Sequence, residues 1–396
     1  MPPLVALLAC AAFLAASPAS DDPPQRRLDA LRREAAGARP PAPRAMSDRL
    51  TGIGDEFLRE GKFAEAIELF SEALGLDPEN GRAIAQLVVA YLDTGDLEFA
   101  DFYLEQATAS VRRRQPPPEV FRTIGDLFES HHRMTEAVAA WDYFRRLKGS
   151  DPAVEKKLDR ARAELSLGVP QRVRTSDRIS LYTDASVPDS VAARVEEYLE
   201  SELAKLSAFF SSPDEGATHV VILYEGRAYF SLVSIPNWVS GIFDGKIRVS
   251  TESPVRWSTE LAGVLSHELA HSYLRSVSRG HAPAWLHEGL GQWFQAQRIP
   301  REDLRRWFAR HEVLSLEQME ALLAGRADRE RTRNVYLEAL GLTEFLIGEN
   351  GSGAMACLVR DLGDGVPFEE ALRRETGLTS RELVSRWKGA MTVPRG

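Results

Sequence analysis

Hydrophobic positions change their period along the chain, and this change predicts two different architectures. From about residue 47 to residue 167 apolar residues recur every three to four positions, the spacing of amphipathic helices. Three later runs are short, rich in β-branched and aromatic residues and bounded by turn residues, which predicts strands at 178–184, 218–224 and 245–251. A long helix is expected at 190–210, and from about Val255 onward the pattern is again helical. We therefore predict the α+β fold class, in which an all-α N-terminal unit precedes a small sheet and a helical half.

The N-terminal helical part contains internal repeats of about 34 residues. The first copy, in segment 47–80, carries Leu50, Ile53, Gly54, Phe57, Ala66, Phe70, Ala73 and Pro78 at the hydrophobic and small positions. The same positions hold Ile84, Leu87, Val88, Tyr91, Ala100, Leu104 and Ala107 in the second copy, and Phe121, Ile124, Gly125, Phe128, Ala137, Trp141 and Phe144 in the third. Small residues allow the two helices of each hairpin to approach closely. Residues 47–168 therefore resemble a tetratricopeptide-repeat solenoid with a polar capping helix at 153–167, which implies a protein partner on the concave surface of the repeats.

The sequence HELAH, at residues 267–271 in the helical half, is a candidate metal-binding motif. On a helix, His267 and His271 project from the same face one turn apart, so both could direct a ring nitrogen at one ion. In an HExxH site the intervening carboxylate, here Glu268, takes a proton from the activated water. An apolar stripe of Leu261, Leu265 and Leu269 lies away from the two histidines. We expect the histidines to face a cleft beside the core.

A catalytic zinc ion uses three protein ligands, so a third ligand is required. The metzincin pattern needs a glycine at position 274 and a histidine at position 277, where this chain has Leu274 and Val277. The sequence WLHEGLGQWF instead offers Glu288, seventeen residues after His271. Pro283 suits the first turn of a second helix, which could bring Glu288 across to the histidines.

Together, the two motifs resemble those of the gluzincin metallopeptidases, and specifically the peptidase MA-like domains, which combine HExxH with a downstream W-L-x-E-G. The resemblance covers roughly residues 175–392 and implies a zincin-like domain that hydrolyses peptide bonds in a peptide or protein substrate. It implies Zn²⁺ as the cofactor, with His267, His271 and Glu288 as its ligands and Glu268 as the general base.

Two further segments resemble parts of that family. NVYLEALG matches the segment whose tyrosine stabilises the oxyanion, which implies this role for Tyr336; a tyrosine packed in the interior is the alternative. NWVSGIFDGKIRVST resembles the edge strand that aligns an extended peptide, although a plain hairpin turning at Asp244 and Gly245 explains it equally well. The chain has no equivalent of the Gly-rich strand ending in a glutamate that aminopeptidases of this clan use, so an aminopeptidase is not expected.

Other residues near the motifs have more ordinary interpretations. His287 is rotated by about 100° from Glu288 on a helix, so the two can scarcely bind one ion. His281 is expected to be a solvent-exposed loop residue, with a substrate contact as the alternative, and His131 and His132 are expected at the surface. Trp285 and Trp293 are expected to pack rather than to line substrate subsites.

Charge and cysteine content argue against nucleic-acid binding and against a metal site or framework made of cysteines. The net charge of −9 argues against a nucleic-acid-binding surface, and the one compact basic run, VRRRQ at 111–115, is interpreted as a solvated helix end. The two cysteines, Cys10 and Cys357, cannot form a cysteine zinc site or a disulfide framework. Any metal must therefore be held by histidines and carboxylates.

The N-terminus predicts export. Residues 1–20 have the apolar run and small residues of a signal peptide, although the first residues lack Lys and Arg. We predict a periplasmic or extracellular protein, with an uncleaved membrane anchor and lipidation at Cys10 as alternatives. Residues 21–46, rich in Pro, Arg and Ala, are interpreted as a linker with room for one short helix. No later segment has the length and composition of a transmembrane helix.

Two functions follow from these observations. The first is a zinc-dependent metallopeptidase whose repeats recruit a protein. The second is a tetratricopeptide scaffold, for instance at a cell envelope, whose peptidase-like domain is not catalytic. The intact Glu268 and Glu288 favour the first, because an inactive domain is free to lose them.

Overall fold

The computed structural model describes residues 23–35, 42–109, 115–167, 171–176, 178–211, 218–232, 235–252, 254–295, 301–308, 310–311, 313–324 and 329–392. The chain divides into two compact units, residues 1–168 and 169–396, and each is described by itself. The predicted signal segment with Cys10, and most of the basic run 111–115, lie outside the described residues.

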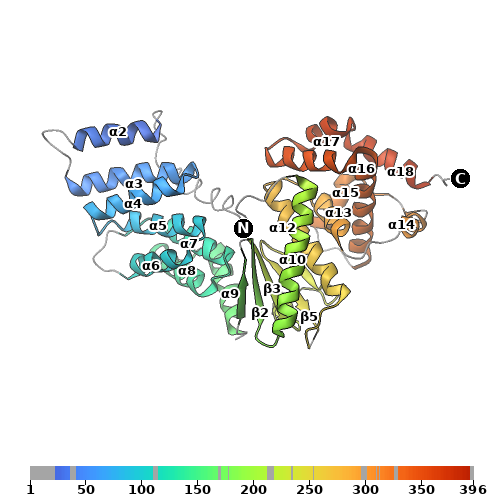
Figure 1. Cartoon of the computed structure of the whole chain (residues 1–396), viewed down its shortest axis with the longest axis horizontal. Coiled ribbons are helices and arrows are strands. Elements are labelled where there is room, and N and C mark those ends of the chain that lie inside the picture. The colour runs from blue at the N-terminus through green and yellow to red at the C-terminus, as the bar shows by residue number, and fades with distance from the viewer. Residues whose placement is uncertain are drawn as a thin grey trace. The chain divides into compact units, whose positions relative to one another are not determined.

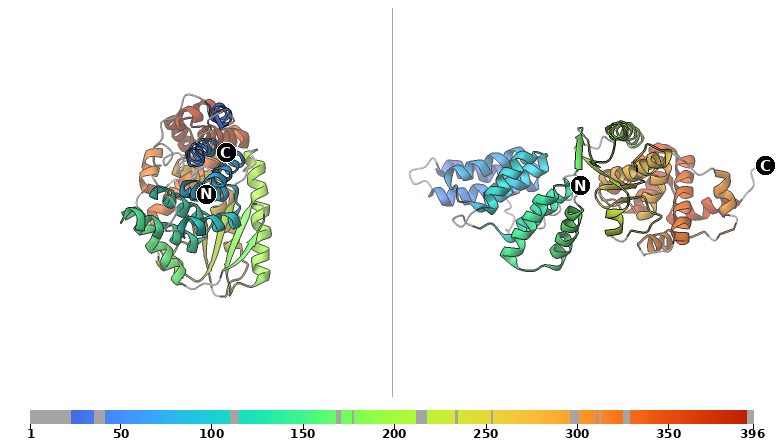
Figure 2. Two further views of the ribbon diagram at one scale, coloured as in Figure 1. Left: turned by 90° about the vertical axis from the view of Figure 1, so that its left-hand side faces the viewer. Right: turned by 90° about the horizontal axis from the view of Figure 1, so that it is seen from below.

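The first unit is a row of helical hairpins (Figures 1 and 2). Its helices are α2 (Pro24–Ala35), α3 (Pro43–Arg59), α4 (Phe63–Leu76), α5 (Gly81–Thr94), α6 (Leu97–Thr108), α7 (Pro118–Ser130), α8 (Met134–Lys148) and α9 (Pro152–Ser166). Helices α3 and α4, α5 and α6, and α7 and α8 pack as antiparallel pairs, and α9 packs on α8. This arrangement agrees with the three predicted repeats and the predicted terminal helix.

Close helix contacts explain the small residues of the repeats. A β-carbon at Gly54 would lie 2.6 Å from the ring of Phe70, and one at Gly125 would lie 2.3 Å from the indole nitrogen of Trp141. Both aromatic rings are fully buried. The first and third hairpins therefore need a glycine on the first helix, where an aromatic side chain of the second helix fills the core; the second hairpin has Val88 and Leu104 at these positions.

Polar side chains connect successive hairpins. Asp55 of α3 is buried, pairs with Arg82 and accepts a hydrogen bond from Gln86 Nε2 at 2.8 Å. The equivalent aspartate of α7, Asp126, accepts a hydrogen bond from Lys157 Nζ at 2.7 Å. The contacts of Asp55 join the first hairpin to the second, and a buried carboxylate is costly without such partners; the contact of the half-buried Asp126 joins the third hairpin to α9.

Two features of this unit differ from the sequence prediction. The short helix allowed for in the linker 21–46 is α2, but its Leu28 and Leu31 are buried in the core of the unit, which was not predicted. His132, predicted at the surface, is 6% exposed and has a left-handed backbone conformation with φ of 58°. His131 is half-buried, with its Nε2 3.1 Å from the carbonyl oxygen of Leu92. Both histidines fill the turn between α7 and α8.

The second unit contains a five-stranded mixed sheet in the order β1-β2-β3-β5-β4. The strands are β1 (Gln171–Thr175), β2 (Ile179–Asp184), β3 (His219–Glu225), β4 (Gly241–Phe243) and β5 (Ile247–Thr251). The pairs β2–β3 and β3–β5 are parallel, whereas β1–β2 and β4–β5 are antiparallel. The central strand β3 is a nearly continuous buried run, as expected for a strand covered on both faces.

The three predicted strands are confirmed to within two residues, but β1 was not predicted. Its sequence, QRVRT, has one apolar residue and so lacks the alternation of apolar and polar residues that predicts a strand. That residue, Val173, is 52% exposed. The sheet therefore begins before residue 175, where the second domain was expected to start. The segment around Asp244 is both a hairpin and a sheet edge, because β4 and β5 form the hairpin and β4 is the outer strand.

Helices make up the rest of the second unit. They are α10 (Asp189–Phe210), α11 (Ala228–Leu232), α12 (Thr259–Val277), α13 (Ala284–Phe294), α14 (Arg301–Phe308), α15 (Leu316–Ala324), α16 (Arg329–Gly363), α17 (Phe368–Thr376) and α18 (Ser380–Thr392). Helix α10 runs along the sheet and packs against β2 and α12 (Figure 1). Helix α12 packs against β4, β5 and α13, and α13 packs in turn against α16. Among the described helices, none has the length and apolar composition required to cross a membrane.

Candidate metal centre

Helix α12 carries the HELAH sequence on a firmly packed element. The hydroxyl of Ser258 caps it by accepting a hydrogen bond from the backbone nitrogen of Leu261 at 3.1 Å. The predicted stripe is confirmed, since Leu261, Leu265 and Leu269 are all buried in the core. The histidine face is turned away from this stripe, toward α13 and β4.

The three predicted ligands come together. Nε2 of His267 lies 3.0 Å from Nε2 of His271. Oε2 of Glu288, on α13, lies 3.5 Å from the first nitrogen and 3.7 Å from the second. The side chains are 15%, 10% and 17% exposed, respectively, so the cluster is mostly but not completely shielded from solvent. Among the described residues, this is the one cluster of histidine, cysteine and acidic side chains arranged to hold a metal ion.

These distances fit a tetrahedral zinc site. Bonds of about 2.0–2.1 Å to a tetrahedral ion place its donor atoms roughly 3.3–3.4 Å apart, and the three observed separations lie on either side of that value. Oε2 of Glu288 is also buried without a hydrogen-bond partner among the described residues. A buried carboxylate oxygen in this state is costly. A cation held by two imidazoles and one carboxylate would satisfy it, and this is a common donor set for catalytic zinc.

Two glycines of the WLHEGLG sequence hold α13 close to its neighbours. A β-carbon at Gly289 would lie 2.1 Å from Oγ1 of Thr343 and 2.5 Å from the carbonyl oxygen of Ala339, both on α16. A β-carbon at Gly291 would lie 2.9 Å from the ring of His267. Gly289 therefore lets α13 pack closely on α16, and Gly291 lets the same helix approach the ring of His267.

Polar contacts fix the same helix at both ends. The backbone nitrogen of Trp285 donates a hydrogen bond to Oε1 of Glu320 at 2.9 Å, which caps the N-terminus of α13. Near the other end, Nε2 of Gln292 donates to the carbonyl oxygen of Tyr336 at 2.7 Å. The sequence alone gave no reason to select Glu320 or Gln292, because their partners are distant in the chain.

Glu268 stands beside the three ligands and against the edge strand. Glu268 is 7% exposed, and a β-carbon at Gly241 of β4 would lie 2.7 Å from Oε1 of Glu268. Burial raises the pKa of Glu268 to about 7, with the nearby charge of His267 opposing the rise and that of Glu288 adding to it. Gly241 was not identified from the sequence; the signal for it was a glycine at the start of a short strand.

The two histidines have different electrostatic surroundings. Burial lowers the pKa of His267, but its interactions with Glu288 and Glu268 outweigh this effect, so the pKa is raised overall. The pKa of His271 is held well below its usual value by burial and by the neighbouring His267 and His287. A neutral His271 is the form that presents a lone pair to a cation.

Tyr336 lies beside the cluster. Its ring is nearly parallel to that of His267, at a centroid separation of 6.5 Å and an interplanar angle of 29°. Burial raises the pKa of Tyr336 well above its usual value, and the carboxylates of Glu288 and Glu268 raise it further. The hydroxyl is thus kept protonated, in the state that can donate a hydrogen bond.

The remaining predicted residues occupy supporting positions. The ring of His287 lies 5.7 Å from that of His271, and burial lowers the pKa of His287 to about 4. His281 is exposed, as predicted, with Nδ1 2.8 Å from the carbonyl oxygen of Leu362. Trp285 is 1% exposed and packs in the core, whereas Trp293 is half-buried against it.

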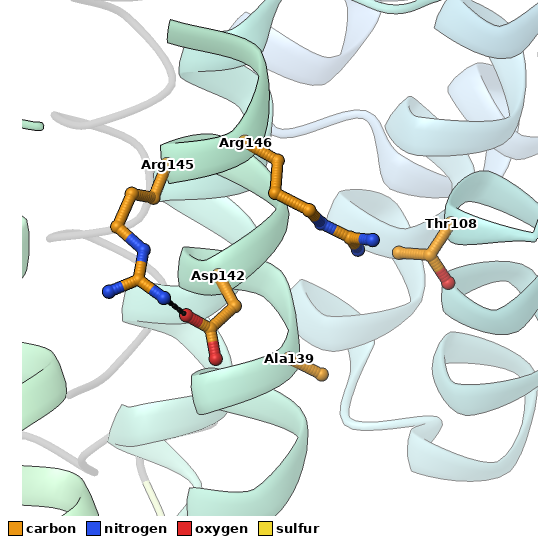
Figure 3. Close-up of a pocket in the computed structure, with 5 residues that line it drawn as sticks. All are labelled: Thr108, Ala139, Asp142, Arg145 and Arg146. Atoms are coloured by element: carbon orange, nitrogen blue, oxygen red, sulfur yellow. Dashed lines mark ion pairs between the residues drawn. The ribbon is translucent and has the colours of Figure 1, made fainter. Parts of the chain in front are cut away.

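A separate hollow lies in the first unit (Figure 3). It has a volume of about 390 Å³ and is lined by Thr108, Ala139, Asp142, Arg145 and Arg146. Arg145 pairs with Asp142 at 2.7 Å, and Arg146 lies over the ring of Tyr143. Its charged groups therefore already have local partners, and it offers no comparable cluster of metal ligands.

Comparison with known proteins identifies the repeats. Residues 57–116 match the family model of the tetratricopeptide repeat. The matched region contains the end of α3, all of α4, α5 and α6, and the segment after them. The tetratricopeptide prediction is confirmed for this part of the chain, and such repeats are typical of protein interaction. No curated protein matches the chain.

Proposed function

We propose that the second unit is a zinc-dependent metallopeptidase of the gluzincin type. One observation carries this proposal: two histidines of one helix and a glutamate of the next converge with donor separations of 3.0–3.7 Å, and the glutamate oxygen is buried without a hydrogen-bond partner among the described residues. His267, His271 and Glu288 would hold the ion. When bound, zinc supplies Lewis-acid activation of a water molecule and of the substrate carbonyl.

Two residues of the chain, Glu268 and Tyr336, would transfer protons and stabilise the developing negative charge. Glu268, between the two histidine ligands, would accept a proton from the attacking water and deliver it to the leaving amine nitrogen. The hydroxyl of Tyr336 would donate a hydrogen bond to the carbonyl oxygen as negative charge develops on it. In the net reaction the amide bond breaks, the carbonyl carbon gains a hydroxyl group and the nitrogen gains a hydrogen.

The edge strand supplies a surface for substrate. Since β4 is the outer strand and its Gly241 touches Glu268, an extended peptide paired with β4 would pass directly beside the general base. Main-chain pairing of this kind binds peptides without strong demands on their side chains. We propose a peptide or protein as the substrate on this basis.

Metal analysis and peptide cleavage test the proposal. The purified protein should contain about one zinc ion per chain, and it should cleave a mixed peptide library in a reaction that a chelator stops and added zinc restores. Glu268→Gln should abolish cleavage while zinc stays bound. Loss of stoichiometric zinc in that variant would contradict the role assigned to Glu268.

The repeats support a second, compatible function. Residues 57–116 belong to a module that typically binds other proteins, so we propose that the first unit recruits a substrate or partner. If the purified protein holds no metal, the alternative of a non-catalytic scaffold is favoured. Export to the periplasm or the extracellular space remains a proposal based on residues 1–20.

A further inference from the structure

Helix α6 exposes an aromatic surface in the first unit. Phe99 and Phe102 are 50% and 54% exposed, among the most exposed large apolar side chains of the described residues. The ring of Tyr91 on α5 stacks on Phe99 and on Tyr103 at centroid separations of 5.0 and 5.7 Å. Phe102 meets Tyr103 edge-on at 5.1 Å. We call these four connected rings the aromatic stripe; adjoining exposed apolar groups of this kind mark interaction sites.

The stripe is not required for the core of its own hairpin. The buried face of α6 consists of Ala100, Leu104 and Ala107. Phe99 and Phe102 are not part of this buried face, and about half of each side chain is exposed. Two exposed phenylalanines reduce solubility without contributing to this core, which is a cost that a binding surface would explain.

The neighbouring charges define the partner. Glu98 and Glu105 are exposed and lie on the same face of α6 as Phe102, because they are four positions before it and three after it. Helix α6 contains no lysine or arginine. Asp101, also on α6, is paired with Arg133 of α8. Glu98 and Glu105 form no ion pair with another residue that the structure describes. An apolar stripe bordered by such carboxylates favours apolar segments that carry positive charge and disfavours acidic ones.

The size of the stripe points to a peptide segment rather than to a folded partner or a second copy. A phenylalanine buries about 150–250 Å² when fully covered, so the exposed halves of two offer roughly 150–250 Å². A stable interface between folded proteins covers about 800 Å² on each partner. The stripe alone is therefore large enough to hold a few side chains of an extended segment.

We propose that the aromatic stripe binds an extended segment of a partner protein in which apolar residues alternate with lysine or arginine. This site lies on the second helix of its hairpin, and it does not depend on the proposed chemistry of the metal centre. Aromatic side chains that remain uncovered in the free protein would supply the apolar contacts, and Glu98 and Glu105 would pair with the basic side chains.

Fluorescence anisotropy with synthetic peptides of about twelve residues tests this proposal. The probes alternate leucine with lysine, leucine with glutamate, or serine with lysine, and the full chain is used with a chelator to prevent cleavage. We expect the leucine–lysine peptide to bind best. Phe99→Ser/Phe102→Ser should weaken it at least about tenfold, whereas Leu165→Ser, which changes a 44% exposed apolar residue of α9, should not.

A matched pair of charge variants tests the carboxylates. Glu98→Gln/Glu105→Gln should weaken binding about three- to tenfold, and added salt should reduce this difference. Glu65→Gln/Glu68→Gln, which removes the same charge from exposed positions of α4, should leave binding unchanged. Circular dichroism checks that all variants are folded.

Several results would overturn the proposal. These are no binding of the leucine–lysine peptide, equal binding of the leucine–glutamate peptide, or equal losses in the test and control variants. The remaining alternative is that the stripe joins two copies of the chain, and sedimentation velocity tests it. Self-association that Phe99→Ser/Phe102→Ser abolishes would favour this alternative over the proposal.

Discussion

The carboxylate of Glu268 lies directly against Gly241. A β-carbon at position 241 would be 2.7 Å from Oε1 of Glu268, 2.9 Å from its Cγ and 2.6 Å from Cγ1 of Val264. The edge of the sheet and the HELAH helix are thus in contact at the residue proposed as general base. A side chain at 241 would have to displace either the strand or the carboxylate.

Gly241→Ala should therefore reduce peptide cleavage more than it reduces zinc binding. A displacement of about 1 Å at a catalytic group can cost on the order of 100-fold in rate, so we expect a loss of about 10- to 100-fold with zinc still near one per chain. The measurement is kcat/KM on a cleaved library peptide, together with metal analysis. Cleavage within about twofold of wild type would show that the contact has no catalytic importance.

Glu288→Gln should impair metal binding, because the neutral amide cannot replace a carboxylate ligand well. We expect zinc affinity to fall by about 100-fold or more, beyond the 10- to 100-fold typical of residues that only support ligands. Competition with a chromophoric chelator measures it. His287→Gln is the matched control, because His287 is next in sequence and its ring lies 5.7 Å from that of His271. A larger loss of zinc in the control would assign the third ligand to His287.

The sequence predicted the candidate site more completely than its supporting structure. HELAH and WLHEG are local motifs whose residues have recognisable chemistry, and the fold brings His267, His271 and Glu288 together as expected. Gly241, Glu320 and Gln292 could not be selected in the same way. Their importance comes from contacts with residues far away in the chain, which neither periodicity nor composition encodes.

In the fold, too, elements with a clear local pattern were predicted, and elements that depend on distant contacts were not. Strands with apolar, β-branched runs were predicted closely, whereas β1 was missed because a polar edge strand lacks the alternating pattern. Burial of Leu28 and Leu31 was also missed, since a short helix among Pro and Arg residues resembles a linker until the core that covers it is known. His132 was placed at the surface because turns usually lie there.

Gly289→Ala should destabilise the packing of α13 on α16. The added methyl group would meet Oγ1 of Thr343 at 2.1 Å and backbone at 2.5 Å, and backbone cannot move aside as a flexible side chain can. Overpacking of this kind typically costs about 1–3 kcal/mol, and the movement of Glu288 should weaken zinc binding as well. Thermal unfolding and zinc affinity are the measurements.

Gly348→Ala provides the comparison for this substitution. Gly348 lies in α16, and a β-carbon there would have no neighbour within 4 Å. Since alanine favours helix by up to about 1 kcal/mol over glycine, the control should be neutral or slightly stabilising. A destabilisation in both variants alike would indicate a general sensitivity of α16 rather than a close contact at Gly289.

Asp93 should make the stability of the repeat unit depend on pH. One carboxylate oxygen of Asp93 is buried without a hydrogen-bond partner among the described residues, and burial raises its pKa to about 7. The folded pKa lies above the ordinary value of 3.8, so the folded state binds the proton more tightly than the unfolded state does. The free energy of unfolding should therefore rise as the pH falls from about 7 toward 4, and the charged form should be costly above pH 7.

Asp93→Asn should remove this dependence. At pH 8 we expect the variant to be more stable than wild type by roughly 1–3 kcal/mol, and at pH 5 we expect a much smaller difference. The measurement is urea unfolding followed by circular dichroism, analysed for the transition of the first unit. Asp55→Asn is the contrasting variant: burial raises the pKa of Asp55 to about 6, but its carboxylate is paired with Arg82 and Gln86. Losing that pair should destabilise the unit at pH 8. Equal stabilisation by both substitutions would contradict the distinction between Asp55, whose carboxylate has partners, and Asp93, one of whose oxygens is buried without a hydrogen-bond partner among the described residues.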